Sequence, residues 1–143
     1  FDAVPGGPNQ VEPNKRPMSS MSPTIVFKDG EPFMTVGSPG GPTIITSVLQ
    51  TIINVIDYDM ELQDAIEEPR IYSSSYPQIR WEEGIPASTR DTMEAWGHEW
   101  QSSPVNIGNV QAIKILEDGS FIGAVDSTRE GTAIGLDKTA GKK

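Results

Sequence analysis

The fold is decided by the stretch 14-NKRPMSSMSPTIVFKDGEPFMTVGSPGGPTIITSVLQTI-52. Two short apolar runs, 24–27 and 33–36, flank the turn sequence Lys28-Asp29-Gly30, and this pattern predicts a β-hairpin. A Gly-Gly-Pro sequence then precedes apolar residues at helical spacing. Proline is favoured in the first helical turn, because its missing N–H would have no partner there. The stretch therefore predicts a hairpin that leads directly into a helix.

The helix after this hairpin carries a dense set of apolar side chains. Their spacing of i, i+1, i+4, i+5, i+8, i+9 and i+12 predicts one apolar face of a 3.6-residue period. β-Branched residues lower intrinsic helix propensity, but packing of such a face usually outweighs that effect. The residues are Ile44, Ile45, Val48, Leu49, Ile52, Ile53 and Ile56.

Two further helices are predicted downstream. One covers 60–67 and is ended by Pro69, and the other covers 87–96 and is ended by Gly97. In the first of these, three apolar side chains are expected to face inward: Leu62, Ala65 and Ile66.

Extended segments make up most of the remaining sequence. Residues 109–116 and 120–125 predict two strands joined by a turn, and residues 70–82 predict extended chain. Residues 1–23 lack periodicity and predict a loop, and the tail from residue 137 predicts a frayed end. Hairpins and helices in separate blocks favour an α+β fold with antiparallel sheets.

Composition limits the classes of function. A chain of 143 residues with 22% charged and 36% hydrophobic residues is typical of one globular domain. The net charge of −9 argues against a nucleic-acid partner, which needs basic patches. The sequence has no cysteine and one histidine, His98, which excludes thiol catalysis and a metal site of cysteines or several histidines. We expect no metal and no cofactor.

The sequence also bears on location. No run reaches the roughly 18 apolar residues of a membrane span, so we expect no span. The chain begins at Phe1 with no visible signal peptide, and any targeting segment would lie outside it. The absence of cysteine fits a secreted or cell-envelope protein, and a cytoplasmic location stays open.

Gly40 and Gly41 lie where the hairpin meets the helix. A helix N-terminus exposes unpaired N–H groups, and glycine lets another atom approach the backbone closely. The pair is therefore a candidate anion hole, either for a phosphate or for the oxyanion of an acyl-transfer intermediate. An ordinary tight turn is the alternative.

Ser19 and Ser20 are a second candidate. Two neighbouring hydroxyls can donate hydrogen bonds to both oxygens of a carboxylate. They make poor nucleophiles, because no base lies nearby in the sequence. A solvated pair of loop serines is the alternative. Asp126 and Arg129 follow the last predicted strand, where a local ion pair would contribute little.

The sequence resembles the small subunit of the γ-glutamyltranspeptidase family. The resemblance rests on 14-NKRPMSSMSPTIV-26, 35-TVGSPGG-41, 68-EPRIY-72 and 126-DSTREGTAIG-135, and it covers nearly all of the chain. Three segments, 2-DAVPGGPNQVEPNKRP-17, 68-EPRIY-72 and 103-SPVNIGNVQ-111, resemble the Bacillus-type branch, near the capsule poly-γ-glutamate depolymerases.

This resemblance implies part of an N-terminal-nucleophile hydrolase, a four-layer αββα sandwich. Such a precursor cuts itself into two subunits, and the new N-terminal threonine forms a γ-glutamyl ester that passes to water or an amine. Ser19 and Ser20 would hold the substrate α-carboxylate, the N–H groups of Gly40 and Gly41 would form the oxyanion hole, and Arg129 is a weaker substrate-binding candidate.

The family's threonine signature would lie upstream of Phe1. We therefore expect residues 1–143 to be the C-terminal part of a small subunit, one incomplete domain that is inactive alone and leaves apolar surface for the large subunit. The substrate could be a glutathione-like γ-glutamyl amide or poly-γ-glutamate. The alternatives are a cephalosporin (glutaryl) acylase and a non-catalytic module that binds carboxylates.

Overall fold

The predicted hairpin is present in the computed structural model of the chain, which describes residue 1 and residues 5–136. Strand β1 (Thr24–Lys28) pairs antiparallel with β2 (Glu31–Gly37). Asp29 and Gly30 form the turn with φ of 55° and 87°. Positive φ at both positions is what a type I′ two-residue hairpin turn requires.

Two C-terminal strands complete the main sheet, as the sequence predicts. Strand β6 (Gln111–Ile115) pairs with β2, and β7 (Phe121–Val125) pairs with β6, giving the antiparallel order β1-β2-β6-β7. This register places Ile25, Thr35, Ile113 and Gly123 side by side across one face of the sheet.

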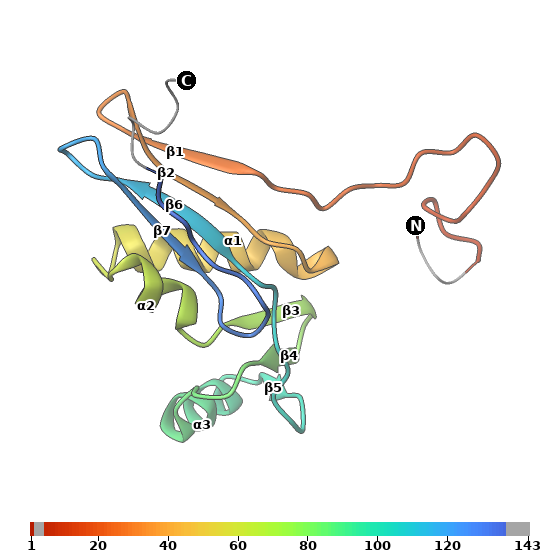
Figure 1. Cartoon of the computed structure of the whole chain (residues 1–143). Helices are drawn as coiled ribbons and strands as arrows, with labels where there is room; N and C mark the ends of the chain where they lie inside the picture. Colours follow the sequence, from red (N-terminus) through yellow and green to blue (C-terminus); the bar gives the residue numbers. More distant parts are fainter. Residues whose placement is uncertain (2–4, 137–143) are drawn as a thin grey trace.

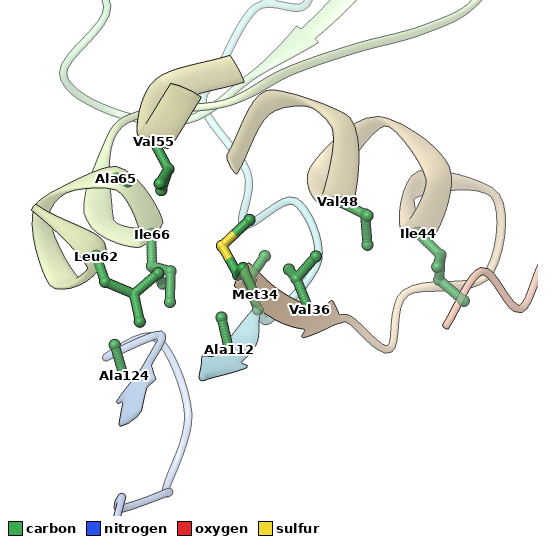
Figure 2. Packing of buried hydrophobic residues seen from close by; sticks show 11 residues of the cluster. Met34, Val36, Ile44, Val48, Val55, Leu62, Ala65, Ile66, Ala112 and Ala124 are labelled. Carbon is green, nitrogen blue, oxygen red and sulfur yellow. The ribbon is translucent and has the colours of Figure 1, made fainter. Parts of the chain in front are cut away.

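The opposite face of this sheet is covered by helices (Figure 1). A 3₁₀ turn, η1 (Gly41–Thr43), leads into α1 (Ile44–Ile56), and α2 (Leu62–Glu67) follows. Figure 2 shows the core between the helices and the sheet. All three inward residues predicted for α2 are buried. The core consists of Met34, Val36, Ile44, Val48, Val55, Leu62, Ala65, Ile66, Val110, Ala112 and Ala124.

The apolar face predicted for α1 is split by the structure. The buried face is formed by Ile44, Ser47, Val48, Thr51 and Val55. Ile45, Leu49 and Ile56 instead lie outside, with 49–55% of their surface exposed. Adjacent helical positions are about 100° apart, so a stripe built from neighbouring pairs is too wide for one sheet to cover.

A second, smaller sheet lies beyond the helices (Figure 1). It contains β3 (Ile71–Ser75), β4 (Gln78–Trp81) and β5 (Glu99–Trp100), and helix α3 (Ala87–Ala95) connects β4 to β5. The pairing of β4 with β5 is parallel, in contrast to the antiparallel pairing expected throughout. The two-residue strand β5 was not predicted, because it is too short for an alternation pattern.

The observed architecture confirms an α+β fold. Residues 5–23 contain no helix or strand and extend away from the body of the protein (Figure 1), as the predicted loop requires. The predicted frayed tail from residue 137 lies outside the described residues. The longest helix that the structure describes, α1, has 13 residues, and no described helix is long and apolar enough to cross a membrane.

Candidate functional site

The glycine pair forms the junction between β2 and α1. Gly40 has a φ of 143° and ψ of 7°, and Gly41 has a φ of 59°. The carbonyl of Gly40 accepts hydrogen bonds from the Thr43 amide (3.3 Å) and hydroxyl (3.0 Å). Within the described chain, the N–H groups of Gly40 and Gly41 donate to no acceptor. Two backbone donors at a helix start are therefore available to an anion.

The serine pair lies beside this junction. The Ser20 hydroxyl donates to the carbonyl oxygen of Gly41 at 2.7 Å. Ser19 is exposed, and its oxygen accepts the Met21 amide at 3.2 Å. The Ser19 hydroxyl proton has no acceptor among the described residues. The structure thus brings the two predicted motifs, 21 residues apart, into direct contact.

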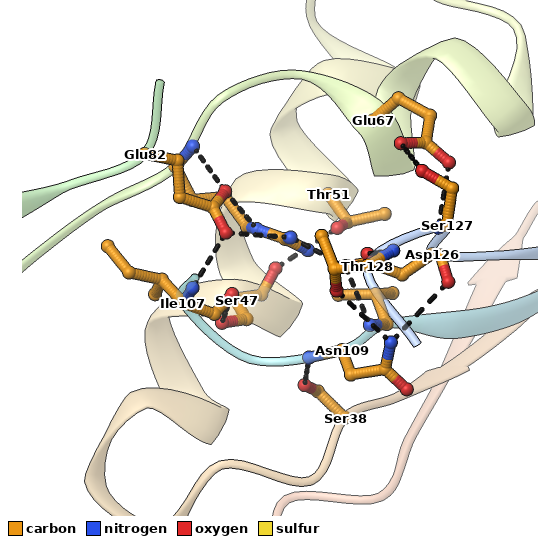
Figure 3. Close-up of polar contacts among 12 residues, drawn as sticks. Ser38, Ser47, Thr51, Glu67, Glu82, Ile107, Asn109, Asp126, Ser127 and Thr128 are labelled. Atoms are coloured by element: carbon orange, nitrogen blue, oxygen red, sulfur yellow. Dashed lines mark hydrogen bonds and ion pairs between the residues drawn. The ribbon is translucent and has the colours of Figure 1, made fainter. Parts of the chain in front are cut away.

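The loop before β6 packs against the glycine pair. A Cβ added at Gly40 would lie 3.2 Å from the Cα of Gly108. The amide of Asn109 donates to the Ser38 hydroxyl at 2.9 Å, which ties the loop to the segment before the glycines (Figure 3). The sequence analysis did not single out Gly108 as a site residue, and an isolated glycine in a polar loop gives little signal.

A buried ionic cluster anchors the same loop from the other side. Arg70, 3% exposed, donates from Nε to Glu82 at 2.8 Å and from Nη2 to Asp126 at 2.5 Å. The amide of Ile107 donates to Glu82 at 2.6 Å (Figure 3), and the amide of Val110 donates to Asp126 at 3.3 Å. Paired charges with several hydrogen bonds are the usual form of buried ionic groups.

Both ends of this cluster remain charged. Burial disfavours the charge on Arg70, but hydrogen bonds and attraction from Glu82 and Asp126 outweigh it and raise the pKa of Arg70. Burial also disfavours the charged form of Asp126 and would raise its pKa. Hydrogen bonds from Thr128 and the pairing with Arg70 outweigh this effect and lower the pKa of Asp126. Nη1 of Arg70 has no hydrogen-bond partner among the described residues.

This cluster replaces the local ion pair considered for Asp126 and Arg129. Asp126 is 1% exposed and pairs with Arg70, 56 positions away. Arg129 is exposed, and it forms no ion pair within the described part of the chain. Among the described residues, no hydrogen bond or ion pair joins Arg129 to the serine or glycine pair.

The single histidine, His98, contacts an aromatic ring. The His98 ring is half-buried and meets the edge of Tyr76 at 5.5 Å between centroids. In residues 5–136, no group of acidic or histidine side chains has the arrangement of a metal site.

Comparison with known proteins assigns the chain to a family. The model of the family described as gamma-glutamyltranspeptidase matches residues 1–136. The chain belongs to the γ-glutamyltranspeptidase family. It is 58% identical, over 137 residues, to a protein named glutathione hydrolase proenzyme from Bacillus subtilis strain 168. That match covers 95% of this chain and 23% of the relative, so the chain spans about a quarter of the relative's length.

Solved structures of γ-glutamyltranspeptidases have the same fold. A mutant of the Helicobacter pylori enzyme is 42% identical and superimposes with a TM-score of 0.78, covering 90% of this chain and 77% of that one. The Bacillus anthracis transpeptidase CapD is 30% identical with a TM-score of 0.73, covering 87% and 75%. The described residues therefore form part of an N-terminal-nucleophile hydrolase fold. The Bacillus-type resemblance is confirmed by the Bacillus subtilis glutathione hydrolase proenzyme, whereas the identity to CapD is lower than that to the Helicobacter enzyme.

Proposed function

We propose that the protein to which this chain belongs transfers a γ-glutamyl group to water or to an amine. The observation that carries the proposal is the contact between the Ser20 hydroxyl and the Gly41 carbonyl. It places a pair of hydroxyls beside two backbone N–H donors that engage no acceptor within the described chain. A γ-glutamyl amide needs both features, one for its α-carboxylate and one for its reacting carbonyl.

In this proposal Ser19 and Ser20 bind the substrate α-carboxylate. The free Ser19 proton can donate to one oxygen directly. The Ser20 hydroxyl donates to the Gly41 carbonyl, so on substrate binding its proton would turn from that carbonyl to the second carboxylate oxygen. Hydrogen bonds to a charged group contribute about 1.5–3 kcal/mol each, which makes this exchange favourable.

The N–H groups of Gly40 and Gly41 are proposed to form the oxyanion hole. A threonine hydroxyl from elsewhere in the precursor would attack the γ-carbonyl carbon, and its proton would pass to the leaving amine as the C–N bond breaks. Water or an acceptor amine would then attack the ester and release the threonine. Each tetrahedral intermediate carries an oxyanion that the two N–H groups can stabilise.

We further propose that residues 1–143 are the C-terminal part of the small subunit and that other parts of the precursor cover their apolar surface. Ile25 and Ile113 are 62% and 43% exposed on the sheet face opposite the helices. A groove on that face runs between the sheet and residues 132–135. A sheet with apolar residues on both faces is normally covered on both.

The substrate class we propose is a glutathione-like γ-glutamyl amide or poly-γ-glutamate. The name of the Bacillus subtilis relative supports the first, and the likeness to a Bacillus transpeptidase keeps transfer to an amine open. Arg129 is exposed and could contact an acidic substrate beyond the γ-glutamyl group. A secreted or cell-envelope location would suit such extracellular substrates.

Expression of the full-length precursor tests the proposal. We expect two fragments, with threonine at the new N-terminus by mass spectrometry, and release of p-nitroaniline from γ-glutamyl-p-nitroanilide. A dipeptide acceptor that accelerates release would establish transfer. A glutaryl anilide, which keeps the carboxylate but lacks the α-amino group, tests the acylase alternative. An uncut chain that binds γ-glutamyl compounds without cleaving them would favour the binding module.

A further inference from the structure

We propose that Gly108 is a positioning residue for the Gly40–Gly41 oxyanion hole. The inference rests on the proposed function for its catalytic consequence, but its structural content stands on the contacts of the loop before β6. A Cβ at Gly40 would lie 3.2 Å from the Cα and 3.7 Å from the amide nitrogen of Gly108, so the two backbones pack closely. The backbone of Gly108 would thus set the direction in which the Gly40 N–H points.

The geometry at Gly108 requires glycine for two reasons. Its φ of 74° lies in the left-handed region, which other residues rarely adopt. A Cβ there would lie 2.4 Å from Oγ of Ser47 and 2.8 Å from Oγ of Ser38. Ser47 is fully buried and donates to the Thr43 carbonyl at 2.9 Å, so it cannot move aside freely. A methyl group at position 108 would therefore push the loop or the glycine turn.

The loop is fixed on both sides of Gly108, and this makes it a rigid support. Ile107 is fully buried and its amide donates to Glu82, whose carboxylate is itself held by Arg70. On the other side the Asn109 amide donates to Ser38, two residues before Gly40 (Figure 3). A displacement of the loop would be transmitted to the segment that carries the two N–H groups.

Gly119 offers a matched control. It lies in the turn between β6 and β7 with a φ of 77°, close to the 74° of Gly108, but a Cβ there would meet nothing within 4 Å. Gly108→Ala and Gly119→Ala thus impose similar backbone strain, and only the first adds a clash, with the side chains of Ser47 and Ser38 beside the glycine turn. A loss specific to Gly108→Ala reports on the packing and not on left-handed φ.

The test uses the full-length, processed protein. We expect Gly108→Ala to lower kcat for γ-glutamyl-p-nitroanilide by roughly 10- to 100-fold, since a misplacement of about 1 Å has effects of this size. KM should stay within about twofold, because the serine pair is untouched. Gly119→Ala should change neither constant. Adding Ser47→Ala, which removes the nearest clashing atom, should restore part of the lost kcat.

A crystal structure of Gly108→Ala provides a readout that does not depend on activity. We expect a changed φ at Gly40 or a displaced Gly40 N–H. An unchanged Gly40 backbone, or a kcat equal to that of Gly119→Ala, would overturn the inference. A wild-type protein without γ-glutamyl activity would instead defeat the proposed function, and the crystal structure would still decide whether Gly108 positions Gly40.

Discussion

The hydroxyl of Ser20 donates a hydrogen bond of 2.7 Å to the carbonyl oxygen of Gly41, and the β1–β2 hairpin lies between these two residues in the sequence. This contact joins the end of the N-terminal loop to the start of the main helix. The two motifs that resemble γ-glutamyltranspeptidases therefore lie in direct contact and form one candidate site.

The two glycines should differ in their tolerance of alanine. At Gly40, φ is 143° and a Cβ would lie 2.5 Å from the Thr43 hydroxyl, whereas at Gly41 a Cβ would meet nothing within 4 Å. We expect Gly40→Ala to reduce kcat by about 100-fold or more, because the clash would move the Gly40 N–H away from the oxyanion, and losing one such donor has an effect of that size. Gly41→Ala should have a smaller effect. Steady-state kinetics measures kcat for both variants, and thermal unfolding checks that both are folded. An equal loss of kcat in the two variants would contradict the prediction.

Loss of the Asp126 charge should destabilise the fold in a pH-dependent way. Removing one partner of a buried ion pair costs about 3–5 kcal/mol, so we expect Asp126→Asn to unfold more easily at pH 7. The pKa of Asp126 is lowered from 3.8 in the fold. The stability that the ionised Asp126 contributes is therefore complete above pH 3.8, the ordinary pKa of an aspartate. It is lost as the pH falls through the lower pKa that Asp126 has in the folded protein.

Denaturant unfolding of the full-length protein between pH 7 and pH 3 measures this effect. The difference in the free energy of unfolding between wild type and Asp126→Asn should decrease as the pH approaches 3. Asp91→Asn, an exposed carboxylate on α3 with no ion pair among the described residues, is the control and should change stability little at any pH. A difference for Asp126→Asn that does not vary with pH would argue against the charged pairing.

The open face of the main sheet should be essential for assembly. Ile113 lies on this face beside Thr35 and Gly123. If another part of the precursor packs there, Ile113→Glu buries a charge and should abolish recovery of two co-purifying fragments. Trp96→Glu is the control, because Trp96 is 71% exposed but lies at the end of α3, away from this face. Normal assembly of Ile113→Glu would show that the face is not covered.

Local patterns predicted most of the elements, because they depend on neighbouring residues. Turn residues and apolar periodicity predicted β1, β2, α1 and the C-terminal strands within a few residues. The two-residue strand β5 carried no periodic signal. The division of α1 into a buried face and an exposed face depends on the width of the sheet below it, which local sequence does not encode.

The candidate site was predictable only in part. Hydroxyl and glycine chemistry made the roles of Ser20 and Gly41 possible, and the family resemblance selected them. The supports of the site come from contacts between distant segments: Arg70 with Asp126, and Gly108 with Gly40. Such pairs have no fixed spacing in the sequence, so the pairing of Asp126 with Arg129 was a reasonable but incorrect expectation.

The serine pair offers the most direct test of the central claim, that this candidate site binds a γ-glutamyl group. The measurement is KM for γ-glutamyl-p-nitroanilide with the full-length protein carrying Ser19→Ala and Ser20→Ala. The control is Ser73→Ala with Ser74→Ala, an exposed adjacent pair on β3. The γ-aminobutyryl anilide, which lacks the α-carboxylate, serves as a second substrate. We predict a KM at least about tenfold higher for the Ser19/Ser20 variant with the first substrate only, and an unchanged KM would contradict the account.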